Sequence, residues 1–172
     1  MEEGCGPFYG KYRGTVTNPI DTTGLGRVQV SVPDVLGDGT FAWAMPAAPY
    51  AGPGVGFFSV PPKDASVWVE FERGDPDAPI WSGCFWEKGQ EPAGTGALAP
   101  LQMLLKTDLF TLQVDHNPSA PTLLLEMNVG GAAGIARIEA TASGMTIGCA
   151  GNTIELARDG VSINKTNLKI LK

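Results

Sequence analysis

The sequence predicts an all-β protein in which a small barrel or sandwich is followed by a strand-rich repeat. The 172 residues include 23 Gly and 14 Pro, a composition that favours many short strands and frequent turns over long helices. Segments in the first half alternate apolar and polar residues with a period of two. A short motif that ends in isoleucine recurs near the end of the chain.

The first half, to about Glu91, is predicted to contain five or six short strands. The first is "KYRGTVT" (11–17), which ends at the turn-rich loop "NPIDTTGLG". The next, "RVQVSV" (27–32), places Val28, Val30 and Val32 on one face. "FAWAM" (41–45) and "VGFFSV" (55–60) follow, each bounded by proline or glycine. These strands form a small barrel or sandwich.

An acidic hairpin completes this half. "SVWVEFE" (66–72) buries Val67, Val69 and Phe71, and "PIWSGCFW" (79–86) pairs back across a turn. That structural turn consists of Gly74, Asp75, Pro76 and Asp77. Asp in a turn commonly bonds its own backbone, so we interpret these acidic residues, with Glu70 and Glu72 on the outer face, as structural.

The clearest linker is "GQEPAGTGALAP" (89–100), which is rich in small residues and proline. We therefore expect a barrel over residues 1–92, a linker over 93–100 and a second domain over 101–172. The second domain contains short strand-prone segments, which are "FTLQV", "TLLLEM", "IARIEA", "MTIG", "TIELA", "VSIN" and "LKIL".

The repeat at the end of the chain has the form [Gly/Asn]-x-x-Ile and ends at Ile147, Ile154, Ile163 and Ile170, with spacings of seven, nine and seven. Repetition at a short period indicates a stacked solenoid. A coiled coil is the less favoured alternative, because the apolar positions alternate at period two and Gly, Thr and Asn are frequent. An ordinary antiparallel meander is a better-supported alternative.

A thin solenoid of this length cannot enclose a core by itself. Each segment offers only two or three inward apolar side chains, whereas three chains wound together can enclose an axis lined by the four isoleucines. We therefore expect a homotrimer whose core includes Ile147, Ile154, Ile163 and Ile170.

Composition excludes several classes of protein. The formal charge is −6 and no Lys/Arg cluster is present, which disfavours a nucleic-acid partner. No apolar run is long enough to span a membrane, and the start of the chain does not read as a signal peptide. The odd number of cysteines fits reduced thiols, and we expect Cys84 and Cys149 to be small buried residues.

We identify no catalytic, metal or cofactor site in the sequence. His116 is the only histidine, and "GLG" (24–26) lacks the following helix that a phosphate loop requires. We therefore expect no enzymatic activity and no cofactor.

The order "GLGRVQV", "AGPG", a strand containing "FE" and "GDPDAP" resembles the oligosaccharide/oligonucleotide-binding (OB) domain of contractile-tail spike proteins. These are the baseplate protein V group of phages and the VgrG proteins of type VI secretion and related injection systems. The resemblance covers about residues 12–83, and the C-terminal repeats are similar in style to the family's intertwined triple-stranded β-helix. It implies an OB-fold barrel followed by an intertwined trimeric β-helix.

The resemblance also implies a function and partners. The protein would be the structural central spike of a contractile injection machine, made in the bacterial cytoplasm without a signal peptide and incorporated into a phage tail-like particle. Because only about ten residues precede the barrel, we expect it to dock on a separate hub protein. A PAAR-type tip protein would bind the end formed by Asn167, Leu168, Lys169, Ile170, Leu171 and Lys172, and the spike would puncture the target membrane mechanically. The alternative function is an OB-fold ligand-binding module for glycan or single-stranded nucleic acid.

Overall fold

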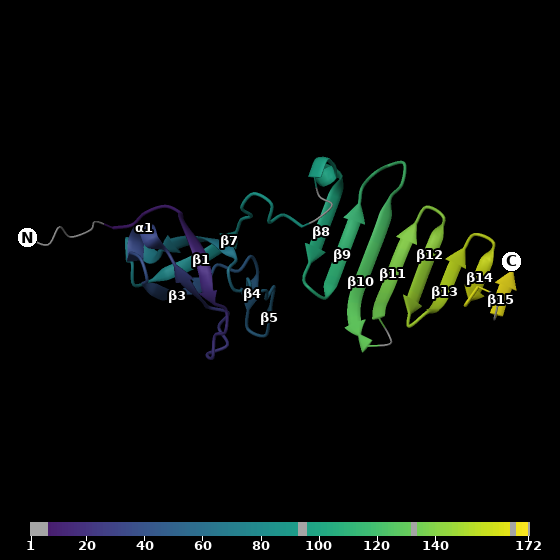
Figure 1. The fold of residues 1–172 in the computed structure, drawn as a ribbon, viewed down its shortest axis with the longest axis horizontal. Helices are drawn as coiled ribbons and strands as arrows, with labels where there is room; N and C mark the ends of the chain where they lie inside the picture. Colours follow the sequence, from purple (N-terminus) through teal and green to yellow (C-terminus); the bar gives the residue numbers. More distant parts are fainter. Residues whose placement is uncertain (1–6, 93–95, 132–133, 166–167, 172) are drawn as a thin grey trace, which may run out of the picture. The chain divides into compact units, whose positions relative to one another are not determined.

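The computed structural model describes residues 7–92, 96–131, 134–165 and 168–171 (Figure 1). The chain divides into two compact units, residues 1–91 and residues 92–172.

The first unit is built around a closed five-stranded barrel with the strand order β1-β2-β3-β7-β6. Its strands are β1 (Tyr12–Asn18), β2 (Val28–Ser31), β3 (Phe41–Pro46), β6 (Ser66–Phe71) and β7 (Pro79–Cys84). Neighbouring strands are antiparallel except β3 and β7, which pair in parallel and close the barrel. The short helix α1 (Pro33–Leu36) follows β2, and a 3-10 turn, η1 (Glu72–Gly74), follows β6.

Period-two alternation produces the barrel core, as the sequence predicts. Val28, Val30 and Val32 are fully buried, while the residues between them in β2 are only partly buried. In β6, Val67 and Val69 are fully buried and Phe71 is nearly so. The rest of the core consists of Val16, Ala44 and Trp81.

The segment "VGFFSV" departs from the prediction of a strand. Only β4 (Ala51–Gly52) and β5 (Val55–Gly56) pair there, as a minimal hairpin. Phe57 and Phe58 lie beyond this hairpin and are exposed. β5 pairs only with β4, so it is not part of the barrel sheet and ends after two residues.

The second unit is one eight-stranded sheet with the order β15-β14-β13-β12-β11-β10-β9-β8. A 3-10 segment, η2 (Gly96–Leu101), leads into it. The strands are β8 (Gln102–Lys106), β9 (Phe110–Asp115), β10 (Thr122–Gly130), β11 (Gly134–Thr141), β12 (Gly144–Cys149), β13 (Asn152–Ala157), β14 (Gly160–Ile163) and β15 (Leu168–Leu171). Each strand pairs antiparallel with the next in the chain, so a single copy forms the meander that was the alternative to stacked coils.

These observations confirm the predicted fold class, which is all-β with an N-terminal barrel consistent with an OB fold and a C-terminal β-rich region. Strand β8 was not among the segments singled out in the sequence. All the strand-prone segments named for the second domain do form strands.

Gly144 is expected to be indispensable for this sheet. It begins β12 with φ +152°, and a Cβ atom there would fall on the carbonyl oxygen of Leu156 in β13. Because this neighbour is backbone, Gly144→Ala should break the β12–β13 pairing and lower the thermal midpoint substantially. Gly148→Ala is the matched control in the same strand, since its Cβ would meet ordinary contacts of 3.5 Å or more. Equal melting of the two variants would contradict this prediction.

Candidate functional site

The C-terminal sheet carries two continuous rows of apolar residues on one face, which we call the apolar face. The pairing between neighbouring strands places one residue of each strand in each row. The two rows lie on the same face because residues two apart on a strand point to the same side. The first row is Leu105, Leu112, Leu125, Ile138, Ile147, Ile154, Ile163 and Leu168. The second row is Met103, Val114, Leu123, Ala140, Met145, Leu156 and Val161, and the backbone register places Ile170 opposite Val161.

The opposite face of the sheet is mainly polar from β11 onward, whereas its central row includes Leu104 of β8 and Leu124 of β10. Its central row aligns Glu139, Thr146, Glu155 and Ser162. Ser162 Oγ donates to a Glu155 carboxylate oxygen at 3.3 Å, and Arg137 lies 3.0 Å from Glu139. One face is therefore suited to water and the other to burial.

The apolar face is uncovered in a single chain. Eleven side chains of the two rows are exposed, from 36% for Val161 and Ile163 to 58% for Met103. Monomeric proteins rarely leave such a large contiguous apolar patch open to solvent. Burying eleven half-exposed side chains at about 1 kcal/mol each would contribute on the order of 10 kcal/mol per chain. We therefore expect the apolar face of the sheet to be buried against another surface.

The isoleucines singled out in the sequence are distributed over both rows. Ile147, Ile154 and Ile163 are successive members of the first row. Leu168, not Ile170, pairs with Ile163, and Ile170 takes the position opposite Val161 in the second row. The sequence repeat did not identify Leu168 as the aligned residue, because hairpins with turns of different length shift the register by an even number of residues.

The end predicted to bind a tip protein lies only partly within the described residues. Leu168, Lys169, Ile170 and Leu171 form the backbone of β15, which pairs with β14 alone in the sheet. Asn167 and Lys172 lie outside the described residues.

The turn Gly74-Asp75-Pro76-Asp77 is held by local hydrogen bonds to Asp75. A carboxylate oxygen of Asp75 accepts a hydrogen bond from the backbone N–H of Asp77 at 3.0 Å. Gly74 is buried with φ +79°, and a Cβ atom there would lie 2.6 Å from Pro7 Cβ. The acidic residues of this turn thus have a local structural explanation.

On the adjacent strand, Glu70 forms an ion pair with Lys11 at 3.0 Å, and Lys11 also donates to Ser82 Oγ. The Lys11 ammonium lowers the pKa of Glu70. Glu72 is exposed.

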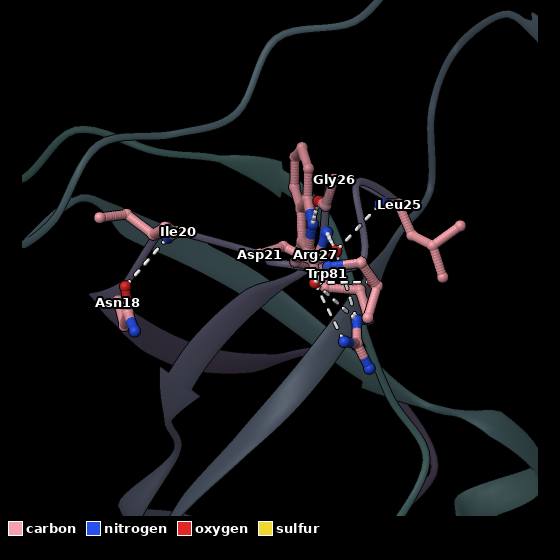
Figure 2. Close-up of polar contacts among 8 residues, drawn as sticks. Asn18, Ile20, Asp21, Leu25, Gly26, Arg27 and Trp81 are labelled. Carbon is pink, nitrogen blue, oxygen red and sulfur yellow. Dashed lines mark hydrogen bonds and ion pairs between the residues drawn. The ribbon is translucent and has the colours of Figure 1, made fainter.

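Asp21 organises the loop between β1 and β2, a role the sequence did not reveal (Figure 2). Its two carboxylate oxygens accept backbone hydrogen bonds from Thr23, Leu25 and Arg27 at 3.0 to 3.2 Å, and a 2.7 Å bond from Thr23 Oγ1. Arg27 Nη2 lies 3.0 Å away, and only 4% of the Asp21 side chain is exposed. Arg27 also stacks on Trp43, with 5.4 Å from Cζ to the ring centroid. The backbone oxygen of Gly26 accepts a bond from Trp81 Nε1 of the core at 3.2 Å, which ties the loop to the barrel.

We expect Asp21→Asn to destabilise the barrel in a pH-dependent way. The hydrogen bonds from Arg27 hold the pKa of Asp21 well below its ordinary value of 3.8. A lowered pKa means that this stabilisation is fully present above pH 3.8 and is lost as the pH falls further toward the folded-state value. The thermal midpoint of Asp21→Asn should therefore be lower by roughly 5 °C at pH 7, and the deficit should shrink below pH 3.8.

Thermal melts followed by circular dichroism test this prediction. Asp77→Asn is the control, because among the described residues no partner is seen for its carboxylate. A deficit that stayed constant from pH 7 to pH 2.5 would show that the ionised carboxylate is not the cause.

The other residues considered in the sequence do not assemble into a reactive site. His116 is exposed, and its backbone N–H donates to Leu101. The expectation that Cys84 and Cys149 are buried is wrong, because both lie at the ends of strands and are exposed free thiols. Within the described part of the chain, no group of three or more His, Cys, Asp or Glu residues could hold a metal ion. The helices described there are all too short or too polar to cross a membrane.

Each of the two units matches a known protein family. Residues 12–86 match the type VI secretion system/phage-baseplate injector OB domain, and residues 102–169 match the phage baseplate V C-terminal trimerisation domain. None of the curated proteins compared matches the chain. The first match coincides with the five-stranded barrel and the second with the sheet that bears the apolar face. The chain therefore belongs to the baseplate V/VgrG-like family of spike proteins, which are structural components of phage baseplates and type VI injectors.

Proposed function

We propose that this protein is the central spike of a contractile injection machine and acts as a homotrimer. The observation that carries the proposal is the apolar face, which one copy leaves open and which belongs to a trimerisation domain. In the proposed assembly, three sheets turn their apolar faces toward a common axis and form an intertwined β-helix. Ile147, Ile154, Ile163 and Ile170 contribute to its core, together with Leu168.

The dimensions of the sheet fit a tapered shaft. From β10 onward the strands shorten, from nine residues in β10 and eight in β11 to four in β14 and β15, whereas β8 and β9, which precede them, have five and six residues (Figure 1). At about 3.4 Å per residue, the wall narrows from about 30 Å to about 14 Å. Seven gaps between strands of about 4.8 Å give a shaft of about 34 Å.

The proposed action is mechanical. The barrels dock on a separate hub protein, and the shaft points toward the target membrane with a PAAR-type tip protein on its end. Sheath contraction then drives the shaft through the membrane. The protein works within an assembled tail-like particle and requires no cofactor or catalytic residue for this role.

Binding of single-stranded nucleic acid or glycan by the barrel is the alternative function. Charge argues against nucleic acid, because residues 1–91 carry six Lys/Arg against twelve Asp/Glu, a balance of −6, whereas residues 92–172 carry six of each. Such binding normally requires a cationic groove beside the stacking aromatic residues. The acidic barrel favours the structural role.

Electron cryomicroscopy of the assembled particle tests the proposal. We expect three copies on the particle axis, with the barrels against the hub and β15 farthest from it. A different number of copies, or an off-axis position, would refute the spike assignment. Light scattering of the isolated protein should give 54 kDa, which is three times the chain mass of 18.0 kDa.

A further inference from the structure

The two ends of the barrel differ in chemistry, and the topology defines them. Strands β1, β3 and β7 run in one direction, and β2 and β6 run in the other. One end therefore collects the segments that follow β1, β3 and β7, including the loops 19–27 and 47–65. The opposite end collects the segments 32–40 and 72–78.

The end that carries the loops 19–27 and 47–65, which we call the apolar end, exposes large apolar side chains beside a cleft. No charged residue occurs between Asp38 and Lys63. The exposed side chains of this end are Ile20, Leu25, Tyr50, Val55, Phe57 and Phe58, and Phe58 is 73% exposed. The cleft has a volume of about 400 Å³, and its lining includes Pro46, Phe57, Phe58, Gly83 and Cys84.

The ring of Phe58 is held in place by the loop that contains Gly26. A Cβ atom on Gly26 would lie 2.9 Å from the ring of Phe58, so the ring rests directly on the loop that Asp21 organises. Trp81, which also borders the cleft, is fixed by its hydrogen bond to Gly26. The exposed aromatic surface is therefore preformed, as in protein interfaces whose free and bound backbones differ little.

The opposite end is acidic, which restricts how copies of this barrel can meet. It carries Asp34, Asp38, Glu72, Asp75 and Asp77, with Arg73 among them. Acidic ends of identical copies repel one another, and juxtaposed like charges strongly disfavour a contact. At the apolar end, Asp21 is paired with Arg27, and the other charged residues of its two loops, Lys63 and Asp64, balance each other. A neutral apolar surface is suited to a second copy of the same barrel.

We propose that, within the trimer, the apolar end of each barrel is covered by the barrel of the neighbouring copy. This inference rests on the proposed trimer. The chain leaves β7 at Cys84, which lines the cleft, and continues to the trimerisation domain at residue 102. In the trimer the chain therefore tethers each barrel, from its apolar end, to the domain that joins the three shafts.

Tethering makes even a weak contact sufficient. Residues 85–101 span at most about 60 Å when fully extended, at up to about 3.6 Å per residue. Short tethers of this kind give effective concentrations in the millimolar range. A barrel contact with a millimolar dissociation constant would be formed in the trimer and absent between isolated barrels. A cyclic trimer requires a heterologous contact, so the Phe58 side of one barrel meets a different surface of the next. That surface is not the acidic end, because its carboxylates would lose their hydration against apolar side chains.

Photo-crosslinking in the full-length protein tests this inference. The photoreactive amino acid p-benzoylphenylalanine replaces Phe58 in one variant and Phe41 in the control. Phe41 is 50% exposed and begins β3, at the acidic end. We expect irradiation of the Phe58 variant to give a covalent dimer of 36 kDa, twice the chain mass, with both crosslinked peptides from residues 7–91. The Phe41 variant should give none.

Thiol labelling provides a second measurement. The measurement uses a variant with Cys5→Ser and Cys149→Ser, in which Cys84 is the remaining cysteine. Its Cys84 should react with a maleimide at least 10-fold more slowly than Cys84 of the same variant with Phe58→Glu added, because the neighbouring barrel covers the cleft only when Phe58 is present.

The outcomes separate the two proposals. Monomers in light scattering would overturn the spike assignment itself. A trimer whose Phe58 crosslinks only within its own chain or to residues 92–172, or whose Cys84 reacts equally in both variants, would overturn the barrel contact alone.

Discussion

Ile154→Asp is expected to abolish the heat-resistant trimer. Ile154 lies within the first apolar row, between Ile147 and Ile163 on the adjacent strands. In the proposed assembly the substitution places three carboxylates close to one axis. Each buried charge costs several kcal/mol even after relaxation, so three cost on the order of 10 kcal/mol. That is comparable with the whole net stability of a typical domain.

Light scattering and thermal melts in detergent measure the effect. The wild type should give 54 kDa, three times 18.0 kDa, and resist heating, whereas Ile154→Asp should give monomers whose C-terminal sheet is unfolded. Thr153→Asp is the matched control, because the neighbouring residue points to the polar face and pairs with Gly148. A trimeric Ile154→Asp protein with wild-type heat resistance would show that the apolar face is not the trimer core.

The location of the buried residues predicts that the folding of the barrel does not depend on trimer formation, whereas the folding of the C-terminal sheet does. The barrel has its own closed core of fully buried valines, so residues 1–92 should fold as a monomer. Among the described residues of the sheet none is buried in one chain, so residues 101–172 should be structured only as a trimer.

Much of the fold could be predicted because alternation reports directly on burial. "RVQVSV" and "SVWVEFE" specify which valines enter the barrel core, and the structure buries those residues. The segment containing Phe57 and Phe58 misled the prediction, because apolar β-prone residues also form exposed interaction surfaces. Local pattern cannot distinguish the two cases.

The candidate site was predictable in part for a different reason. The recurring isoleucines identify the face that is buried on assembly, but register depends on turn length, so Leu168 takes the aligned position expected of Ile170. The role of Asp21 could not be inferred, because its partners Thr23, Leu25 and Arg27 converge only through the loop conformation. Cys84 and Cys149 were misassigned because apolar neighbours in sequence do not guarantee burial at the end of a strand.

Deletion of residues 167–172 is expected to release the tip protein while leaving the trimer intact. Among the described strands, β15 is an edge strand that pairs only with β14. Three copies would present three such edges at the narrow end of the shaft, and exposed edges invite pairing with another chain. A conical partner that covers them would both protect the edges and sharpen the point. Removing β15 takes away this surface, but the seven remaining strands keep both apolar rows, so assembly should persist.

Co-purification with a tagged PAAR-type tip protein measures the effect. The wild type should retain the tip, and the deletion variant should lose it while still giving a trimer mass in light scattering. A chain that ends at Leu171 is the matched control, because it keeps the whole of β15 and should retain the tip. If the deletion variant still binds the tip protein, or if the full-length protein never does, then the end of the shaft is not the tip-binding surface. We expect the deletion variant to lose the tip protein because the narrowing of the sheet brings three unpaired strand edges together on a small area. One partner can cover all three edges there.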